Sequence, residues 1–244
     1  MLSLELNPAL DAACIQSRFA ETNRVQIRNF LTDWCAERLA RTLEEQHDWN
    51  LVTTHGGRHI DLDYRGMEAR PQADKDRLQA IVHEQARADF GYLFCNVPLY
   101  DLAHREKLQE LALLEVYRFL NSSPAIEFVR SVTGAEDISF ADSQATKYLP
   151  GHFLTTHDDA VQGKNRRAAY VLSMTRDWRP DWGGLLQFFG DDGRFEEAFI
   201  PGFNTLSIFA VPQQHSVSVV APFAGAPRYS ITGWFRAGED PGPG

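Results

Sequence analysis

The second half of the chain contains seven short runs of β-branched and aromatic residues, and this spacing constrains the fold more than any other feature. Turn residues such as Gly183-Gly184, Asp192-Gly193 and Pro201-Gly202 separate the runs. Strands this short and numerous bury their apolar faces in a sandwich or a jelly-roll barrel. The predicted core spans residues 136–237, and its runs are 138–149, 168–174, 185–189, 195–200, 205–211, 216–220 and 228–235.

The first half has a different pattern of apolar residues, and we expect residues 1–135 to form a mainly helical support packed on the outside of the barrel. Apolar residues at helical spacing predict helices from Thr32 or Asp33 to Gln46, and over 73–88, 102–120 and 124–132. The stretch 50–64 is typical of a hairpin that turns at Gly56-Gly57. We predict a single domain over residues 1–244 with a disordered tail, "GEDPGPG", at 238–244.

Composition limits the partners and the compartment. The net charge of −9 disfavours a nucleic-acid surface, so a basic peptide is the more natural charged partner. No apolar run is long enough to span a bilayer, and Glu5 and Asp11 do not fit a signal peptide, so we expect no membrane contact. The odd, widely spaced cysteines, Cys14, Cys35 and Cys95, suit free thiols in the cytoplasm.

Two His-x-Asp pairs occur in the sequence, His59-Ile60-Asp61 and His157-Asp158-Asp159. On a strand, residues i and i+2 share a face, so either pair places an imidazole beside a carboxylate. The pair at 59 leads into a charged helix, whereas the pair at 157 is followed by strands and by His215. Two histidines and one carboxylate on a barrel form a facial triad that holds Fe(II) and leaves positions open, so we favour the second pair.

The closing strand, "RYSITGWF", supplies an anion-binding candidate. Strand alternation places Arg228 and Ser230 on one side, together with Thr232 and Trp234. An arginine that faces into a barrel is costly to bury unless an anion meets it, and its planar fork suits a carboxylate. The sequence therefore predicts a metal centre with a carboxylate-binding arginine.

These motifs resemble those of the Fe(II)/2-oxoglutarate-dependent dioxygenases of the prolyl 4-hydroxylase type. "KYLPGHFLTTHDD" is similar to the pattern in which a tyrosine and a glycine precede His-x-Asp, and "DWGGLLQFF" is similar to the family's Gly-Gly strand. The resemblance covers residues 144–235. Within the family, the sequence resembles most the catalytic domain of the ribosomal-protein prolyl hydroxylases. Those proteins carry a second barrel that this sequence does not reach, and the insert "APFAGAP" lengthens the gap between His215 and Arg228.

The resemblance implies a double-stranded β-helix, the jelly-roll form of this family, and assigns roles. His157, Asp159 and His215 would bind Fe(II), and together with Arg228 they would form the catalytic set. Arg228, with Tyr148, Tyr170 and Ser230, would bind 2-oxoglutarate; the alternative for each tyrosine is simple packing with its hydroxyl bonded to the backbone. O2 would be the oxidant, ascorbate a supporting reductant, and succinate and CO2 the co-products.

The implied substrate is a prolyl residue in a protein or peptide, such as a ribosomal protein or a translation factor. The basic stretch "QGKNRR", with Lys164, Arg166 and Arg167, either contacts that substrate or forms a solvated turn. Hydroxylation of a free amino acid or another small molecule is the alternative within the enzyme class. A cupin-like metal-binding or sensing module is the alternative outside it, and Arg228 argues against this module because plain metal binding needs no anion site.

Overall fold

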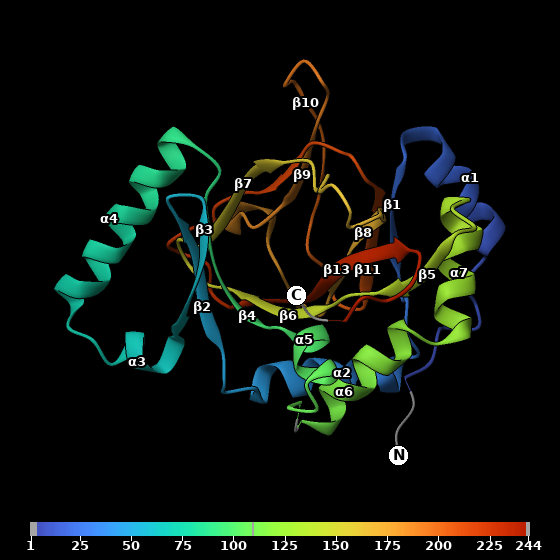
Figure 1. Ribbon diagram of the computed structural model, residues 1–244, viewed down its shortest axis with the longest axis horizontal. Helices are drawn as coiled ribbons and strands as arrows, with labels where there is room; N and C mark the ends of the chain where they lie inside the picture. Colours follow the sequence, from blue (N-terminus) through green and yellow to red (C-terminus); the bar gives the residue numbers. More distant parts are fainter. Residues whose placement is uncertain (1–3, 109, 243–244) are drawn as a thin grey trace.

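The computed structural model describes residues 4–108 and 110–242, and all of its named strands in these ranges join one antiparallel sheet that curls into a nearly closed barrel (Figure 1). The sheet order is β1-β11-β8-β13-β6-β4-β7-β12-β9-β10, with β2 and β3 added beside β4 and with β5 beside β13. The jelly-roll architecture expected from the spacing of the short runs is therefore confirmed.

The strands of the second half follow the predicted runs, with one division and one additional strand, β7, that was not among those runs. The run 138–149 is two strands, because Asp142 and Ser143 lie outside the ladder with β13 and separate β5 from β6. The bounds are β5 Ile138–Ala141, β6 Gln144–Tyr148, β7 Phe153–His157, β8 Arg166–Ser173, β9 Leu186–Phe189, β10 Phe195–Phe199, β11 Thr205–Ala210, β12 His215–Val217 and β13 Arg228–Ala237.

The first half contributes more strands than the sequence analysis predicted. The hairpin at Gly56-Gly57 is confirmed, and both glycines have the positive φ angles that such a turn requires. Two further strands were missed, because each is only five or six residues long and lies next to helical patterns. The bounds are β1 Arg24–Arg28, β2 Asn50–His55, β3 Arg58–Asp63 and β4 Tyr92–Val97.

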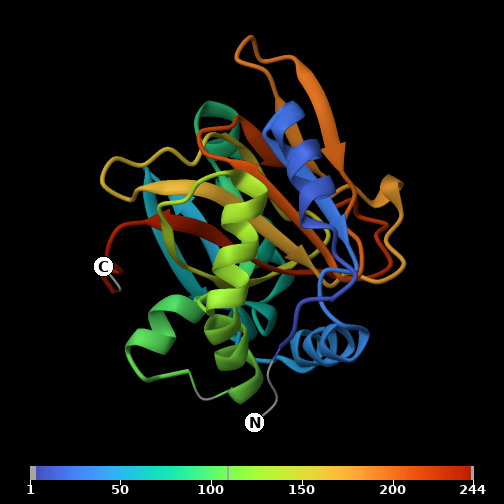
Figure 2. The ribbon, with the colours of Figure 1, turned by 90° about the vertical axis from the view of Figure 1, so that its right-hand side faces the viewer.

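Helices pack outside the barrel, as expected (Figures 1 and 2). In Figure 1, α1 and α7 cover one side, α3 and α4 lie beside the β2–β3 hairpin on the other, and α2, α5 and α6 lie below. The bounds are α1 Ala12–Thr22, α2 Asp33–Glu45, α3 Tyr64–Glu68, α4 Gln72–Ala88, α5 Leu99–His104, α6 Leu111–Leu120, α7 Ser123–Thr133 and a 3-10 turn, η1, Pro180–Trp182.

One predicted helix is wrong in its length. The stretch 102–120 is not continuous, since α5 ends at His104 and α6 begins at Leu111. Glu106 has a φ of 54°, a left-handed conformation that a right-handed helix cannot include. The helices at 33–45, 72–88 and 123–133 agree with the predictions within one residue, and Gly134 ends the last one with a φ of 71°.

The main hydrophobic core lies between the barrel wall and the helices. Leu172, Ile208 and Ile231, on three different strands of the sheet, are fully buried and pack with Leu31 and Leu43 from the first half. Burying a side chain of this size stabilises the fold by roughly 1.5–3 kcal/mol. Because the helices bury the outer face of the strands, the inner face is left to line the barrel mouth.

The C-terminal segment, for which the sequence predicts a disordered tail, contacts α5 over part of its length. Residues 238–242 run beside α5, where the Tyr100 hydroxyl donates to the Asp240 carboxylate and His104 Nε2 lies 3.1 Å from Asp240 Oδ2. Residues 243–244 lie outside the described part. Within that part, every helix is too short or too polar to cross a membrane.

Candidate active site

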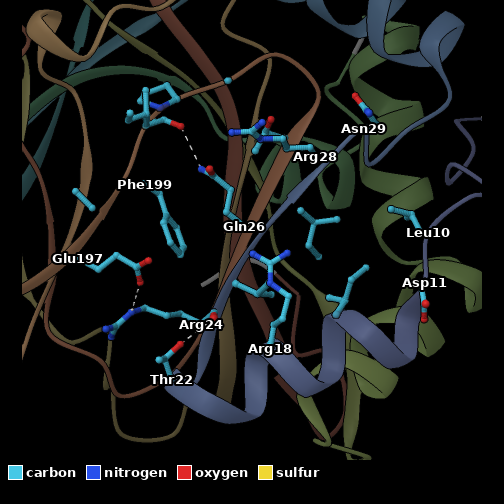
Figure 3. A pocket seen from close by; sticks show the side chains of 18 of the residues that line it. Leu10, Asp11, Arg18, Thr22, Arg24, Gln26, Arg28, Asn29, Glu197 and Phe199 are labelled. Carbon is cyan, nitrogen blue, oxygen red and sulfur yellow. Dashed lines mark hydrogen bonds and ion pairs between the residues drawn. The ribbon is translucent and has the colours of Figure 1, made fainter.

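Two cavities are prominent, and only the smaller one contains the predicted chemistry. The larger, about 1020 Å³, lies between α1, β1 and the segment after β10, where Arg24 pairs with Glu197 at 3.0 Å and Gln26 Nε2 donates to the Ile200 carbonyl at 3.1 Å (Figure 3). The smaller, about 720 Å³, opens at the barrel mouth and is lined by His157, Asp159, His215 and Arg228. We therefore place the candidate active site in the smaller cavity.

The two histidines of the predicted triad lie opposite each other on neighbouring strands. His157 ends β7, His215 begins β12, and the two are paired in the antiparallel register. Directly opposed residues of an antiparallel pair project from the same face, so the imidazole rings lie only 4.1 Å apart between centroids. A register shift follows between His215 and Val217, the kind of irregularity that re-aims side chains at functional sites.

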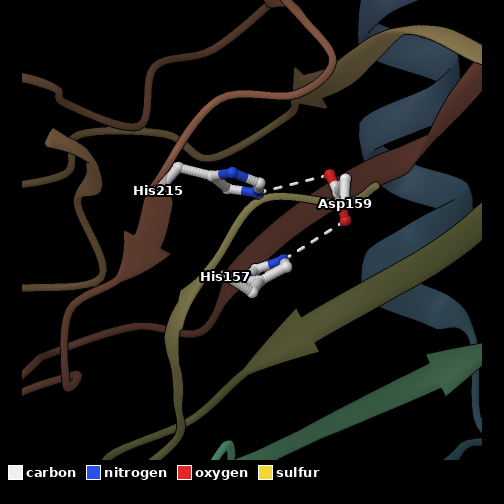
Figure 4. A group of neighbouring side chains, drawn as sticks. All are labelled: His157, Asp159 and His215. Carbon is white, nitrogen blue, oxygen red and sulfur yellow. Dashed lines mark ion pairs between the residues drawn. The ribbon is translucent and has the colours of Figure 1, made fainter. Parts of the chain in front are cut away.

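Asp159 reaches the histidines by a different route from the one predicted. The sequence analysis placed His157 and Asp159 on one strand face, but β7 ends at His157 and Asp159 follows in a loop. Its φ of 63° is a left-handed conformation that aspartate tolerates better than most residues. The carboxylate thereby turns back between the rings, 3.3 Å from His157 Nε2 and 3.4 Å from His215 Nε2 (Figure 4).

The donor atoms of this group fit a metal ion. One ligand atom from each of His157, Asp159 and His215 lies within 4.8 Å of the others. Each Nδ1 faces a backbone carbonyl, Thr155 at 2.9 Å and Gln213 at 2.7 Å, so the proton on each ring belongs on Nδ1. This arrangement leaves both Nε2 lone pairs free for a metal, because the hydrogen bonds from Nδ1 to the backbone carbonyls fix the tautomer.

Burial sets the charge of the group. Burial and the neighbouring His157 ring lower the pKa of His215 to about 4, so His215 is neutral near pH 7 and ready to ligate. Burial alone would raise the pKa of the Asp159 carboxyl group, but its interactions with the His157 and His215 side chains outweigh burial and lower the pKa, so Asp159 is ionised near pH 7. The triad therefore presents two imidazole nitrogens and one carboxylate, a donor set suited to Fe(II).

Of the three basic residues in "QGKNRR", only two line the cavity. Arg166 and Arg167 belong to β8 rather than to a loop. Arg166 donates to the Asp159 backbone carbonyl at 2.9 Å and lies over the Trp234 ring at 3.5 Å, whereas Arg167 pairs with Asp137 outside the barrel at 2.7 Å. Arg166 thus supports the left-handed Asp159, Lys164 lines the cavity edge, and Arg167 faces away from it.

Arg228 lies on the cavity wall without a protein anion. Its side chain is 2% exposed, its Nε has no hydrogen-bond partner, and burial lowers the pKa of its guanidinium group. Within residues 4–108 and 110–242 it forms no ion pair, and the group is held against the face of Tyr148 at 4.9 Å. A buried, unpaired guanidinium is costly, so the geometry fits a carboxylate that enters from the cavity.

Two neighbours shape the pocket around Arg228. Tyr148 stacks on Phe94 with the rings 5.1 Å apart and 8° from parallel, which fixes its orientation. Gly184 has a φ of 62°, and a Cβ placed there would lie 3.2 Å from Arg228 Cδ. The "DWGGLLQFF" turn therefore approaches the arginine closely because position 184 has no side chain.

The remaining predicted cofactor residues are placed less directly. The Tyr170 hydroxyl lines the cavity but donates to the Asp142 carbonyl at 2.9 Å, as in the packing alternative. Ser230 is fully buried, and its hydroxyl bonds to that of Thr146 at 2.8 Å. Thr146, which the sequence analysis did not single out, lines the cavity beside Arg228.

The other His-x-Asp pair lies at the edge of the same cavity. His59 Nε2 lies 3.1 Å from Asp61 Oδ1, and His59 Nδ1 lies 2.6 Å from the Tyr92 hydroxyl. Among the described residues, no third ligand joins this pair, and the only candidate metal group is the triad at 157, 159 and 215. Sequence reasoning missed that β3 and β4 border the site, because β4 was not predicted.

Comparisons with known proteins agree with this geometry. A family model described as the 2OG-Fe(II) oxygenase superfamily matches residues 143–236. The prolyl 3-hydroxylase OGFOD1 of Mus musculus is 31% identical over 168 residues, 66% of this chain and 30% of that protein. The chain spans less than a third of the length of the curated relatives it matches.

Solved structures show the same fold. A prolyl-4-hydroxylase of Pseudomonas putida superposes with a TM-score of 0.59 at 19% identity, over 94% of this chain and all of that one. A prolyl hydroxylase of Trichoplax adhaerens, in complex with a hypoxia inducible factor peptide fragment, superposes with a TM-score of 0.57 at 14% identity, over 93% of this chain and 89% of that one. At such low identity these two likenesses concern the fold.

Proposed function

Because this chain belongs to the 2OG-Fe(II) oxygenase superfamily, we propose that it is an Fe(II)- and 2-oxoglutarate-dependent dioxygenase that hydroxylates a prolyl residue in a protein. The observation that carries the proposal is the pairing of two features in one cavity. The His157, Asp159 and His215 group offers a metal donor set, and Arg228 lies unpaired on the wall of the same cavity.

The triad would hold Fe(II), with His157 and His215 ligating through Nε2 and Asp159 through its carboxylate. The backbone carbonyls of Thr155 and Gln213 keep the Nδ1 protons in place, so the rings need no rearrangement on binding. Bound Fe(II) would supply the activation of O2 that is coupled to oxidative decarboxylation of 2-oxoglutarate, yielding succinate and CO2. Arg166 holds the Asp159 backbone in place by its hydrogen bond to the Asp159 carbonyl.

Arg228 would bind the distal carboxylate of 2-oxoglutarate. A charge-assisted, bidentate pair would satisfy the guanidinium group that the protein leaves without an anion. Tyr148 holds the guanidinium from one side, and the glycine at position 184 lets the neighbouring turn close against it. Leu154, Leu186 and Val217 complete an apolar lining that excludes water from the co-substrate.

The prolyl substrate rests on the names of the relatives and not on a bound ligand. The matched mouse relative is a prolyl 3-hydroxylase, and the Trichoplax adhaerens structure holds a peptide fragment. A ribosomal protein or a translation factor in the cytoplasm is the proposed source of the target proline. Three free cysteines are consistent with a reducing compartment.

A metal-binding or sensing module without turnover is the competing hypothesis from another class. Such a module gains nothing from a buried, unpaired arginine, which destabilises the fold until an anion binds. The unpaired Nε of Arg228 therefore favours the dioxygenase.

The test is an anaerobic titration followed by turnover. Fe(II) and 2-oxoglutarate together should produce a charge-transfer absorbance band that neither produces alone, and admission of O2 should then release succinate. His215→Ala should show no band at any 2-oxoglutarate concentration. A protein that binds Fe(II) but gives neither the band nor succinate would be the metal-binding module.

A further inference from the structure

At one end of the active-site cavity, three side chains form a hydrogen-bonded chain that the proposed reaction does not use. His59 on β3 lies 2.6 Å from the Tyr92 hydroxyl on β4 through Nδ1, and 3.1 Å from Asp61 Oδ1 through Nε2. Thr54 of β2 lies opposite His59 in the sheet register, and β2 also pairs with β4. The hydrogen-bonded side chains therefore reach from β3 across β2 to β4 on one face of the sheet. His59, Asp61 and Tyr92 all line the cavity.

The proton positions in this chain follow from the donors and acceptors. The Asp61 carboxylate only accepts, so a neutral His59 carries its proton on Nε2 and accepts the Tyr92 proton at Nδ1. Burial and the nearby Asp61 raise the pKa of Tyr92 to about 12, so the phenol stays protonated at neutral pH. The Tyr92 oxygen and the second Asp61 oxygen keep acceptor capacity, and neither offers a proton to a ligand.

Aromatic faces surround these acceptors. Phe90 is 40% exposed, and its ring lies 5.6 Å from that of Tyr92 and 5.3 Å from that of His157. A group seated on Phe90 and Tyr92 would therefore lie next to the triad. Aromatic faces attract cations, above all when a carboxylate lies beside them.

The positive side chains of the cavity lie elsewhere. Arg166 and Arg236 face Asp159 and Asp142, Arg228 lies against Tyr148, and Lys164 belongs to the loop 158–165 between β7 and β8. The lining residues contributed by β3 and β4 include no lysine or arginine. This end of the cavity is thus rich in acceptors and aromatic faces, and it lacks a cation of its own.

We propose that Asp61, Tyr92 and Phe90 form a subsite for a lysine or arginine side chain of the substrate, close in sequence to the residue that is hydroxylated. Tyr92 is the specificity-determining residue: its ring carries the aliphatic stem of the substrate side chain, and its oxygen, held by His59, accepts from the cation along with Asp61. The peptide nature of the ligand rests on the proposed function, whereas the preference for a cation rests on this cluster.

Binding of a small probe tests the subsite without turnover. N-acetyl-arginine methylamide and its citrulline analogue, which has the same shape but no charge, are titrated into the whole protein and followed by two-dimensional NMR. The arginine probe should bind tighter by on the order of tenfold, since its hydrogen bonds are charge-assisted. Asp61→Asn should reduce its affinity to that of the citrulline probe, and Tyr92→Leu should weaken both probes more than Tyr92→Phe does.

Asp101→Asn is the matched control, because Asp101 lines the same cavity but belongs to α5. It should leave the preference for arginine intact. Equal affinity for the two probes, no binding of either, or the same loss in Asp61→Asn and Asp101→Asn would overturn the subsite.

Turnover separates this inference from the proposed function. Proline-containing peptides with arginine or citrulline at each flanking position are compared for hydroxylation by mass spectrometry. Faster use of an arginine peptide by the unaltered protein, with the advantage lost in Asp61→Asn, supports the subsite. Equal hydroxylation of both series overturns the subsite and leaves the proposed function standing. Discrimination between the probes without any consumption of 2-oxoglutarate supports the subsite and contradicts the proposed function.

Discussion

Replacing Arg228 with methionine should make the protein more stable and unable to respond to 2-oxoglutarate. Arg228 is 2% exposed, its Nε is unpaired, and among the described residues its guanidinium group contacts the aromatic face of Tyr148 and no carboxylate. A buried polar group without its partner costs about 1–3 kcal/mol, and methionine fills a similar volume without that cost. In a chain of this size each kcal/mol shifts the melting temperature by about 2–4 °C.

The assay is thermal unfolding with and without 2-oxoglutarate, in the presence of a redox-inert divalent metal. At a concentration of one hundred times Kd the co-substrate stabilises the unaltered protein by about 2.7 kcal/mol. Arg228→Met should melt a few degrees higher than the unaltered protein when 2-oxoglutarate is absent, and should show no further rise when it is added.

Arg236→Met is the matched control. Arg236 is also buried, but it lies 3.5 Å from Asp142 and donates to the Lys164 carbonyl at 2.7 Å. Removing it leaves a buried carboxylate with fewer partners, so this variant should melt lower. An Arg228→Met protein that melts lower without co-substrate and still gains stability from 2-oxoglutarate would refute the role assigned to Arg228.

Three other outcomes are expected. His157→Ala should abolish stoichiometric Fe(II) binding in calorimetry with an unchanged circular dichroism spectrum, whereas His59→Ala should bind iron normally; the reverse pattern would favour the other His-x-Asp pair. Burial lowers the pKa of His152 to about 4, so the unfolded chain binds an extra proton between pH 6.5 and 4, and stability should fall by about 3 kcal/mol as the pH drops through that window; a His152→Leu protein with an equal acid loss would contradict this. Gly184→Ala should weaken 2-oxoglutarate binding at least tenfold, while Gly193→Ala, at a position that also has a positive φ but open space around it, should not; equal affinities would show that position 184 does not shape the pocket.

The sequence was sufficient to predict the barrel and to select the candidate metal-ligating residues, because both depend on local patterns. Short runs with turn residues at fixed spacing describe a jelly roll, and His157, His215 and Arg228 each begin or end a strand. The turn at Gly56-Gly57 and the helix end at Gly134 were predictable because glycine alone takes those conformations without strain.

Other features depended on tertiary contacts. Asp159 lies beside His157 because it turns back through a left-handed conformation that Arg166 supports from β8, and not because the two residues share a strand face as strand alternation predicted. Strand β4 is a short run beside helical patterns, and without it the position of Tyr92 and His59 at the cavity edge was not predictable. The break between α5 and α6 rests on Glu106, whose type does not indicate a positive φ.

The most direct test of the central claim is incorporation of isotopically labelled O2 into a prolyl residue. The host proteome is compared with and without the active protein, in the presence of Fe(II) and 2-oxoglutarate, and proline-containing peptides are sequenced by mass spectrometry. We expect a one-oxygen mass increase on proline that carries the label, matches the succinate formed, and disappears in the His215→Ala protein. A label found only in free amino acids or other small molecules, or no label at all while 2-oxoglutarate is consumed, would contradict it.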